Sequence, residues 1–320
     1  MAIFQKVRYT DRNESGIDER LSDRMSGCTL CPRMCGADRE NGKTGFCGET
    51  GEIRAARAAL HMWEEPCISG KEGSGTVFFT GCTLRCVFCQ NHEIAGSKVG
   101  KVISEERLAE IFLELQGKGA NNINLVTAGH YLPIVIESIK RARKSGLTIP
   151  IVYNSSGYEK VEAIEALDGI VDIFLPDFKY ISSEMAARYS NAPDYPEVAK
   201  RALAQMVKQT GGAKFDERDM MKRGVIVRHL ILPGHIKESK EAIRYLYETY
   251  GDQIYISIMN QYTPMPGIEK RFKNLGRTIT QKEYDEVVDY AIDLGVENGF
   301  IQEGETAKES FIPQFDDTGL

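Results

Sequence analysis

Three cysteines follow a strand-like run, and this feature constrains the fold of the chain more than any other. Cys82, Cys86 and Cys89 have the spacing Cys-x3-Cys-x2-Cys and come directly after the apolar run 76–80. Cysteine thiolates hold iron–sulfur clusters, and a cubane normally takes four of them. No cysteine follows position 89, so a cluster here would keep one iron open for a ligand, as catalytic metal sites do. A zinc knuckle that lacks one ligand, or three buried thiols without a metal, are the alternatives.

A second set of cysteines lies near the N-terminus. Cys28, Cys31, Cys35 and Cys47 have the spacing Cys-x2-Cys-x3-Cys-x11-Cys, with glycines at 36, 42, 45 and 48. Four thiolates at such spacing can close a tetrahedral site, and the glycines permit tight turns. Zinc and an Fe–S cluster both accept four thiolates, so the spacing does not separate them. Structural thiols without a metal are the alternative. The remaining cysteine, Cys67, is interpreted as a small buried residue.

Apolar, β-branched runs alternate with longer helical patterns from residue 75 onward, which is typical of parallel βαβ units. Strands are expected at residues 76–80, 123–127, 150–153, 171–175, 224–232 and 253–258. Helices are expected at residues 105–116, 132–144, 159–166, 195–209, 239–250 and 281–294. Ser104, which precedes two glutamates, favours a helix start at the first of these. Six strands are too few for a closed eight-stranded barrel.

Polar residues follow several of these strands, where parallel α/β folds place their ligand-binding groups. Asp177 and Lys179 come after the fourth strand, and their equal parity lets both face the interior. A structural ion pair is the alternative for these two. Asn154, after the third strand, is expected to partner Asp177.

The remaining strand ends offer further candidates. Arg228 and His229 have opposite parity on the fifth strand, so only one can point inward. Thr127 and His130 follow the second strand, where His130 is either a polar group over the site or a cap of the next helix. Gln261, after the sixth strand, is a candidate for adenine or substrate contact, as is the neighbouring Tyr262.

The stretch 78–91, with the three cysteines and an aromatic just before the last of them, resembles the radical S-adenosylmethionine (SAM) superfamily. It is similar to the branch that contains the pyruvate formate-lyase activating enzymes and their uncharacterised relatives. The four-cysteine segment, with its Cys-Pro-Arg, resembles the uncharacterised members of that branch. The resemblance to the activating enzymes covers mainly residues 75–265.

The resemblance implies an α/β fold with an open, partial (β/α)6 barrel. It implies that Cys82, Cys86 and Cys89 hold a [4Fe-4S] cluster whose fourth iron is chelated by the methionine part of SAM. Phe88 would lie beside the adenine, Asp177 and Lys179 near SAM and a monovalent cation, and Arg228 near the SAM carboxylate. The Gly-Gly-Glu-like motif that meets the SAM amino group in most members has no counterpart after the second strand, so Thr127 or backbone carbonyls must supply this contact.

These features together predict an enzyme that reductively cleaves SAM to a 5′-deoxyadenosyl radical, which abstracts a hydrogen atom from the substrate. A low-potential donor, flavodoxin or ferredoxin, would supply the electron. The nearest specific activity is the activation of a glycyl-radical enzyme, so that a protein is a candidate substrate. The alternatives are a radical SAM enzyme that modifies another protein or a small molecule, and an Fe–S electron carrier or scaffold without SAM chemistry.

Composition limits the other possibilities. The net charge of −6 argues against a nucleic-acid partner, and no run of eighteen apolar residues suggests a membrane span. The N-terminus lacks an apolar signal core, so a cytoplasmic location is expected, where cysteines are more often metal ligands than disulfides. We expect an N-terminal arm and cysteine segment at 1–70, a barrel at 71–265, and a helix and tail packed on it at 266–320.

Overall fold

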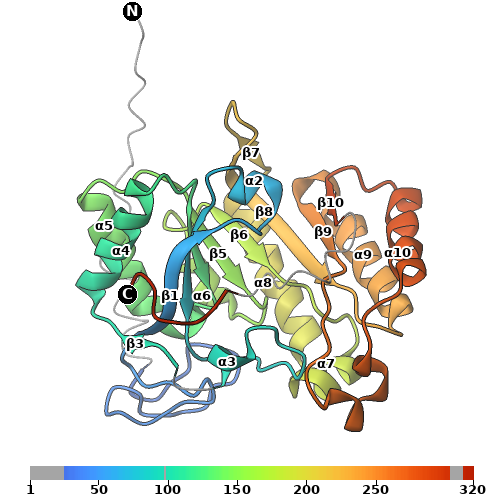
Figure 1. Cartoon of the computed structure of the whole chain (residues 1–320), viewed down its shortest axis with the longest axis horizontal. Coiled ribbons are helices and arrows are strands. Elements are labelled where there is room, and N and C mark those ends of the chain that lie inside the picture. The colour runs from blue at the N-terminus through green and yellow to red at the C-terminus, as the bar shows by residue number, and fades with distance from the viewer. Residues whose placement is uncertain (1–24, 97–98, 303–312) are drawn as a thin grey trace, which may run out of the picture.

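A curved ten-stranded sheet forms the centre of the computed structural model, which describes residues 25–96, 99–302 and 313–320 (Figure 1). Of the N-terminal arm and cysteine segment expected at 1–70, residues 1–24 lie outside the described residues. Six neighbouring strands run parallel, in the order β2, β4, β5, β6, β8, β9. They span Ser74–Phe79, Ile123–Val126, Ile151–Ser155, Ile173–Pro176, Met221–Leu230 and Tyr255–Met259. These are the six strands expected from the sequence, within a few residues at each end.

Four further strands extend this parallel series. β1 (Arg54–His61) pairs antiparallel with β2, and β3 (Lys101–Val102) pairs with β1. β10 (Gly299–Ile301) continues the parallel order beyond β9, and β7 (Lys214–Phe215) pairs with β8 outside the main path. Because β10 and β3 stand at the two ends of the path, the described sheet is an open, partial barrel, as predicted.

Helices cover the outside of the curved sheet, with α4 and α5 near β1 and with α9 and α10 near β9 and β10 (Figure 1). The long helices are α4 (Glu105–Gly117), α5 (Leu132–Lys144), α8 (Tyr195–Thr210), α9 (Ile236–Tyr250) and α10 (Gln281–Leu294). Ser104 caps α4 by accepting a hydrogen bond from the Arg107 N–H over 3.1 Å, as expected. Shorter helices are α2 (Pro66–Ser69), α3 (His92–Ala95), α6 (Val161–Glu165) and α7 (Ser183–Ser190). Within the described residues, no helix combines the length and apolar character needed to cross a bilayer.

The chain enters the inside of the barrel from the end where its parallel strands begin. β1 runs against β2 and brings His61 opposite Ser74, at the start of β2. From there α2 packs Cys67 and Ile68 against Val152, Ile173, Leu175 and Ile226, side chains of β5, β6 and β8. Cys67 is buried, as predicted. This apolar layer closes one end of the barrel, so a polar site has room only nearer the carboxyl ends of the strands.

The last described segment runs beside β1. The N–H of Ala58 donates to the carbonyl oxygen of Thr318 over 2.8 Å, and the Phe315 ring contacts Phe78 with its centroid 5.6 Å away. The sheet therefore includes strands from outside residues 71–265: β1 comes before this range and β10 comes after it. The division into three segments stays a prediction.

Candidate functional site

The three cysteines of the loop after β2 line one cavity of about 390 Å³. Two backbone N–H groups, those of Leu84 and Arg85, each donate to the Cys82 sulfur over 3.4 Å. The Ser190 hydroxyl donates to the Cys86 sulfur over 3.0 Å. Donors from the loop and from Ser190 therefore favour the thiolate form of Cys82 and Cys86.

The surroundings of the thiols explain what a ligand would have to supply. Burial raises the pKa of Cys89 to about 12 and also raises that of Cys86, and the neighbouring cysteine sulfurs add to this. The Lys179 ammonium opposes the effect on both. Thiolates in such a place need a strong cation nearby, and a coordinating metal deprotonates a thiol outright.

The donor set fits an iron–sulfur cluster. A cubane offers several irons, so its thiolates need not converge on one point. Three thiols on one loop, facing a cavity with ordered donors behind them, suit such a group.

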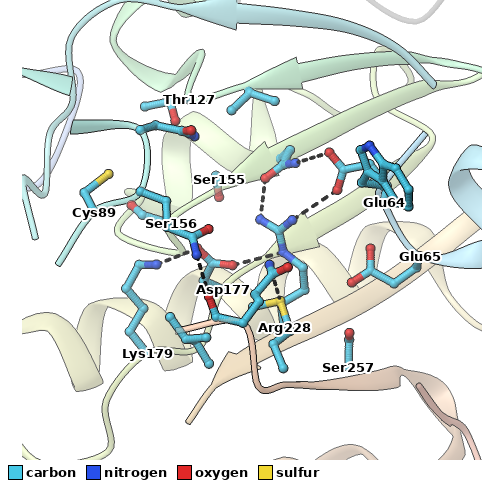
Figure 2. A pocket seen from close by; sticks show the side chains of 18 of the residues that line it. Glu64, Glu65, Cys89, Thr127, Ser155, Ser156, Asp177, Lys179, Arg228 and Ser257 are labelled. Carbon is cyan, nitrogen blue, oxygen red and sulfur yellow. Dashed lines mark hydrogen bonds and ion pairs between the residues drawn. The ribbon is translucent and has the colours of Figure 1, made fainter. Parts of the chain in front are cut away.

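A charged network faces these cysteines across the cavity (Figure 2). Asp177 holds two cations at once, because its Oδ2 lies 2.6 Å from the Lys179 Nζ and its Oδ1 lies 3.0 Å from the Arg228 Nε. The Arg228 Nη2 donates to the Asn154 Oδ1 over 2.6 Å. The Nη1 of the same guanidinium pairs with the Glu64 Oε2 over 3.2 Å. These contacts bring β5, β6 and β8 together with the segment after β1.

Electrostatics keep Asp177 and Lys179 charged although both are buried, whereas burial raises the pKa of Glu64. Burial works against the charge on Asp177, but Lys179 and Arg228 lower its pKa below the ordinary range. Burial likewise opposes the charge on Lys179, but Asp177 and the Cys86 sulfur raise its pKa. Lys179 therefore presents a fixed ammonium between a carboxylate and the cysteine loop, where an anionic group of a ligand would be stabilised.

Thr127, directly after β4, has a strained backbone. Its φ is +61°, which is unusual for a β-branched residue and costs of order 1–3 kcal/mol. Its N–H donates to the Asn154 carbonyl over 2.9 Å, and the residue lines the cavity. Strain of this kind clusters at ligand sites.

The other predicted contacts divide between the cavity and its surroundings. Phe88 and Gln261 line the cavity. Phe88 is buried among the edges of Tyr180, Tyr189 and Tyr262, with ring centroids 6.3–6.4 Å away. The Tyr262 hydroxyl donates instead to the Leu275 carbonyl over 2.6 Å.

The histidines near the site serve its framework. His229 points away from the cavity, with its ring nitrogens bonded to the Phe178 carbonyl and the Ser239 hydroxyl, whereas Arg228 points in. The His130 Nε2 donates to the Thr80 carbonyl over 2.7 Å, and burial lowers the pKa of this histidine to about 3. His130 therefore fixes the end of the β2 strand as a neutral ring and does not reach over the site.

Sequence reasoning missed one wall of the cavity. His61, at the end of β1, and Glu64 and Glu65, just after it, line this wall, and Ser257 lines it from β9. The pair of adjacent carboxylates at 64 and 65, followed by a proline, was the available signal. Without the antiparallel placement of β1, nothing located this pair inside the barrel.

The four N-terminal cysteines also lie together. The Cys28 and Cys35 sulfurs share a hydrogen bond, and the Cys31 thiol is influenced by both Cys28 and Cys47. A methyl group at Gly45 would lie 3.3 Å from the Cys35 sulfur and 3.4 Å from the Cys47 sulfur, so this glycine leaves the space between them free. Burial raises the pKa of Cys31 to about 12.

Arginines join this segment to the barrel. Arg39 is buried, and it donates to the Thr50 carbonyl and to the His130 carbonyl, each over 2.7 Å. Arg33 donates to the Thr83 carbonyl over 2.9 Å and to the Leu84 carbonyl over 3.3 Å, both in the cysteine loop after β2. The two cysteine sets are thus parts of one packed structure.

Comparison with known proteins places the chain in a family. The model of the radical SAM superfamily matches residues 76–246, more than half of the 320-residue chain. An uncharacterised protein of Methanocaldococcus jannaschii is 30% identical over 296 residues, which cover 90% of this chain and 81% of that protein.

Two solved structures are similar to parts of the chain at low identity. SuiB of Streptococcus suis, bound to S-adenosylmethionine, is 12% identical with a TM-score of 0.48, over 71% of this chain and 50% of SuiB. HydG, a maturase of the [FeFe]-hydrogenase, is 15% identical with a TM-score of 0.48, over 72% of this chain and 52% of HydG. The chain spans about half the length of each. The family match implies a [4Fe-4S] cluster and SAM as cofactors. On its sequence, the chain belongs to the radical SAM superfamily.

Proposed function

We propose that the protein is an enzyme that binds a [4Fe-4S] cluster through Cys82, Cys86 and Cys89 and cleaves SAM in the cavity beside it. The observation that carries the proposal is the convergence of three thiols with the Lys179–Asp177–Arg228 network on one cavity. An electron carrier has no need of such a network, because a cluster that only passes electrons requires no ligand pocket.

The residues of the chain have separate parts in binding SAM. The resemblance assigns Arg228 to the SAM carboxylate, but its guanidinium already contacts Asp177, Glu64 and Asn154. We therefore propose the Lys179 ammonium for the SAM carboxylate, with Asp177 holding it in place. Thr127 and the neighbouring backbone carbonyls would accept from the SAM amino group, and Phe88 would face the adenine. The complete proposed set of SAM contacts is Phe88, Thr127, Asn154, Asp177, Lys179, Arg228 and Gln261.

The cofactors carry the difficult chemistry, and the protein contributes binding, orientation and exclusion of water. When bound, the cluster and SAM would supply one-electron cleavage of a sulfonium and hydrogen abstraction from the substrate. The buried walls of the cavity, from Phe78 and Val126 to Met259, would keep water from the reacting groups. We propose flavodoxin or ferredoxin as the electron donor, since the reduction requires a low potential.

For the substrate we propose a protein, activated by removal of a hydrogen atom from a glycine. The Asp-x-Lys pair at 177 and 179, similar to that of the activating enzymes, supports this choice. Transfer of deuterium from a labelled glycine of a candidate protein into 5′-deoxyadenosine tests it. If deuterium reaches 5′-deoxyadenosine from a position other than glycine, the substrate is not a glycyl-radical enzyme.

We propose that Cys28, Cys31, Cys35 and Cys47 hold a second metal centre, zinc or an Fe–S cluster. Their mutual proximity supports it. Metal analysis of a Cys82→Ala/Cys86→Ala/Cys89→Ala triple variant decides between the two. About one zinc per chain indicates a tetrahedral zinc site, iron with sulfide indicates a cluster, and absence of both contradicts the second centre.

Electron paramagnetic resonance tests the main proposal without relying on turnover. The protein is reconstituted anaerobically and reduced with dithionite. We expect the spectrum of the reduced cluster to change when SAM is added, because SAM would bind the open iron. Cys86→Ala should lose this cluster signal, whereas Cys67→Ala, which changes a buried cysteine of the apolar layer, should keep it. A cluster spectrum that SAM leaves unchanged would contradict the proposal.

A further inference from the structure

One carboxyl group of the cavity has no role in the network described above. Glu65 follows Glu64 in the segment after β1 and lines the cavity. The residue is only 8% exposed. Among the described residues, its Oε2 has no hydrogen-bond partner. Ser257, on β9, supplies a side-chain hydrogen bond to this carboxyl group. A buried carboxyl oxygen that faces a cavity without a donor points to a ligand that carries one.

The charges of the cavity show which kind of ligand suits Glu65. Its two cationic side chains are already paired, because Lys179 binds Asp177 and Arg228 binds both Asp177 and Glu64. His61, which also lines the cavity, is neutral, since burial lowers its pKa to about 4. Burial and the neighbouring Glu64 raise the pKa of Glu65, and the charge of Arg228 opposes this without a direct ion pair to Glu65. A positively charged ligand at the unpartnered Oε2 would favour the ionised carboxylate.

We propose that Glu65 and Ser257 form a substrate subsite that binds a positively charged nitrogen group, an alkylammonium or a guanidinium. This inference deepens the proposed function and rests on it, since it assigns a substrate class to the same cavity. An ammonium or guanidinium donates to a carboxylate through charge-assisted hydrogen bonds, which are the strong ones. The Ser257 hydroxyl holds the carboxyl group in place beside the ligand.

The walls near Glu65 suit the carbon stem of such a group. Met259 follows Ser257 on the same face of β9, and Phe300 on β10 stands in register with Ser257. Both side chains line the cavity. An alkyl chain could lie against them with its charged end at Glu65, as basic side chains do when they bury their stems.

The subsite is separate from the groups proposed to hold the cofactors. In Figure 2, Cys89, Thr127 and Lys179 lie on one side of the Asp177–Arg228 pair, and Glu65 and Ser257 lie on the other. Glu65 and Ser257 also fall outside residues 76–246, the part that matches the superfamily model. This is the expected place for residues that select a substrate and do not serve the chemistry common to the superfamily.

Titration calorimetry on the full chain, reconstituted anaerobically, tests the subsite with n-butylammonium as the probe and n-butanol as its neutral counterpart. We expect n-butylammonium to bind at least tenfold more tightly than n-butanol. Glu65→Gln should weaken n-butylammonium binding at least tenfold, and Glu65→Asp should restore part of it. The control Glu165→Gln makes the same change at an exposed position of α6 and should leave binding unchanged. Equal affinity for the two probes, or an unchanged affinity in Glu65→Gln with wild-type unfolding behaviour, overturns the subsite.

Two further titrations identify the source of the charge. SAM, added first, should leave n-butylammonium binding in place; if SAM abolishes it, Glu65 belongs to the SAM amino group and the subsite is overturned. A blocked peptide with glycine next to lysine should bind at least as tightly as n-butylammonium if the cation is a protein side chain. If the peptide binds more weakly than n-butylammonium, the subsite is assigned to a small-molecule amine. Failure of the wild-type protein to cleave SAM would contradict the proposed function, whereas failure of the amine titration alone would contradict only the subsite.

Discussion

The backbone N–H of Cys82 donates a hydrogen bond to the carbonyl oxygen of Cys47 over 3.2 Å. One cysteine belongs to the N-terminal set and the other to the loop after β2, so a single backbone contact joins the two candidate metal centres. Arg33 reinforces the contact from the N-terminal side by donating to the Thr83 and Leu84 carbonyls. The shape of the cysteine loop after β2, the cluster loop, thus depends on the four-cysteine segment.

This dependence predicts the effect of Arg33→Ala. Arg33 also donates to the Ser190 and Asn191 carbonyls, so its removal leaves the cluster loop and the end of α7 without shared donors. We expect a loss of about 2 kcal/mol in the free energy of unfolding and faster loss of iron from the reconstituted protein. Urea unfolding and iron release to a chelator measure the two effects. Arg141→Ala, which removes exposed ion pairs on α5, should change neither. Wild-type iron retention in Arg33→Ala would show that the segment does not support the loop.

Lys179→Met tests the anion-binding part of the site. The substitution keeps the length of the side chain and leaves Asp177 paired with Arg228. We expect SAM affinity to fall by a factor of about 10–100, since a hydrogen bond between charged groups contributes about 1.5–3 kcal/mol. Equilibrium dialysis with labelled SAM measures this, with Lys208→Met on α8 as the matched control. SAM affinity within twofold of wild type would place the SAM carboxylate elsewhere.

The strained backbone at Thr127 predicts opposite effects on stability and binding. Thr127→Gly relieves a positive φ that costs of order 1–3 kcal/mol, so thermal stability should stay equal or rise. SAM affinity should fall, because the side chain and the fixed carbonyl direction are lost together. Calorimetric unfolding measures the thermal stability, and the same dialysis assay measures the SAM affinity. If Thr127→Gly destabilises the protein and binds SAM normally, the strain serves folding and not the ligand.

A buried acid predicts how stability depends on pH. Burial raises the pKa of Glu159 to about 8. The folded protein therefore keeps a proton on Glu159 that the unfolded chain loses near pH 4.5, and stability falls as pH rises from about 4.5 through 8. The contribution is at most on the order of 5 kcal/mol. Glu159→Gln should be more stable than wild type at pH 8, with the difference shrinking toward pH 5. Urea unfolding of the two proteins across this range checks the sign, and parallel curves would contradict it.

Much of the barrel could be predicted because its signals are local. Continuous β-branched runs separated by amphipathic segments identify buried parallel strands, and the parity of Arg228 and His229 shows that only one can point inward. The rule that ligand groups follow parallel strands brings Asn154, Asp177 and Lys179 together. Each of these features lies within a short stretch of sequence and does not depend on which distant segments meet.

The missed features depend on such knowledge. β1 is rich in alanine and arginine, which do not reveal whether a segment is helix or strand. Its antiparallel pairing with β2 carries Glu64 and Glu65 into the barrel, and no spacing within the sequence signals that placement. β10 is only three residues long, too short for a recognisable pattern, and lies in a segment expected to be helix and tail. The link from Cys47 to Cys82 likewise joins residues whose proximity only the folded chain determines.

The central claim is tested most directly by measuring 5′-deoxyadenosine and methionine after SAM and dithionite are added to the anaerobically reconstituted protein. We expect equal amounts of both products from the wild type and from Cys67→Ala, and none above background from Cys86→Ala. Wild-type protein with an intact, reducible cluster that yields neither product would contradict it.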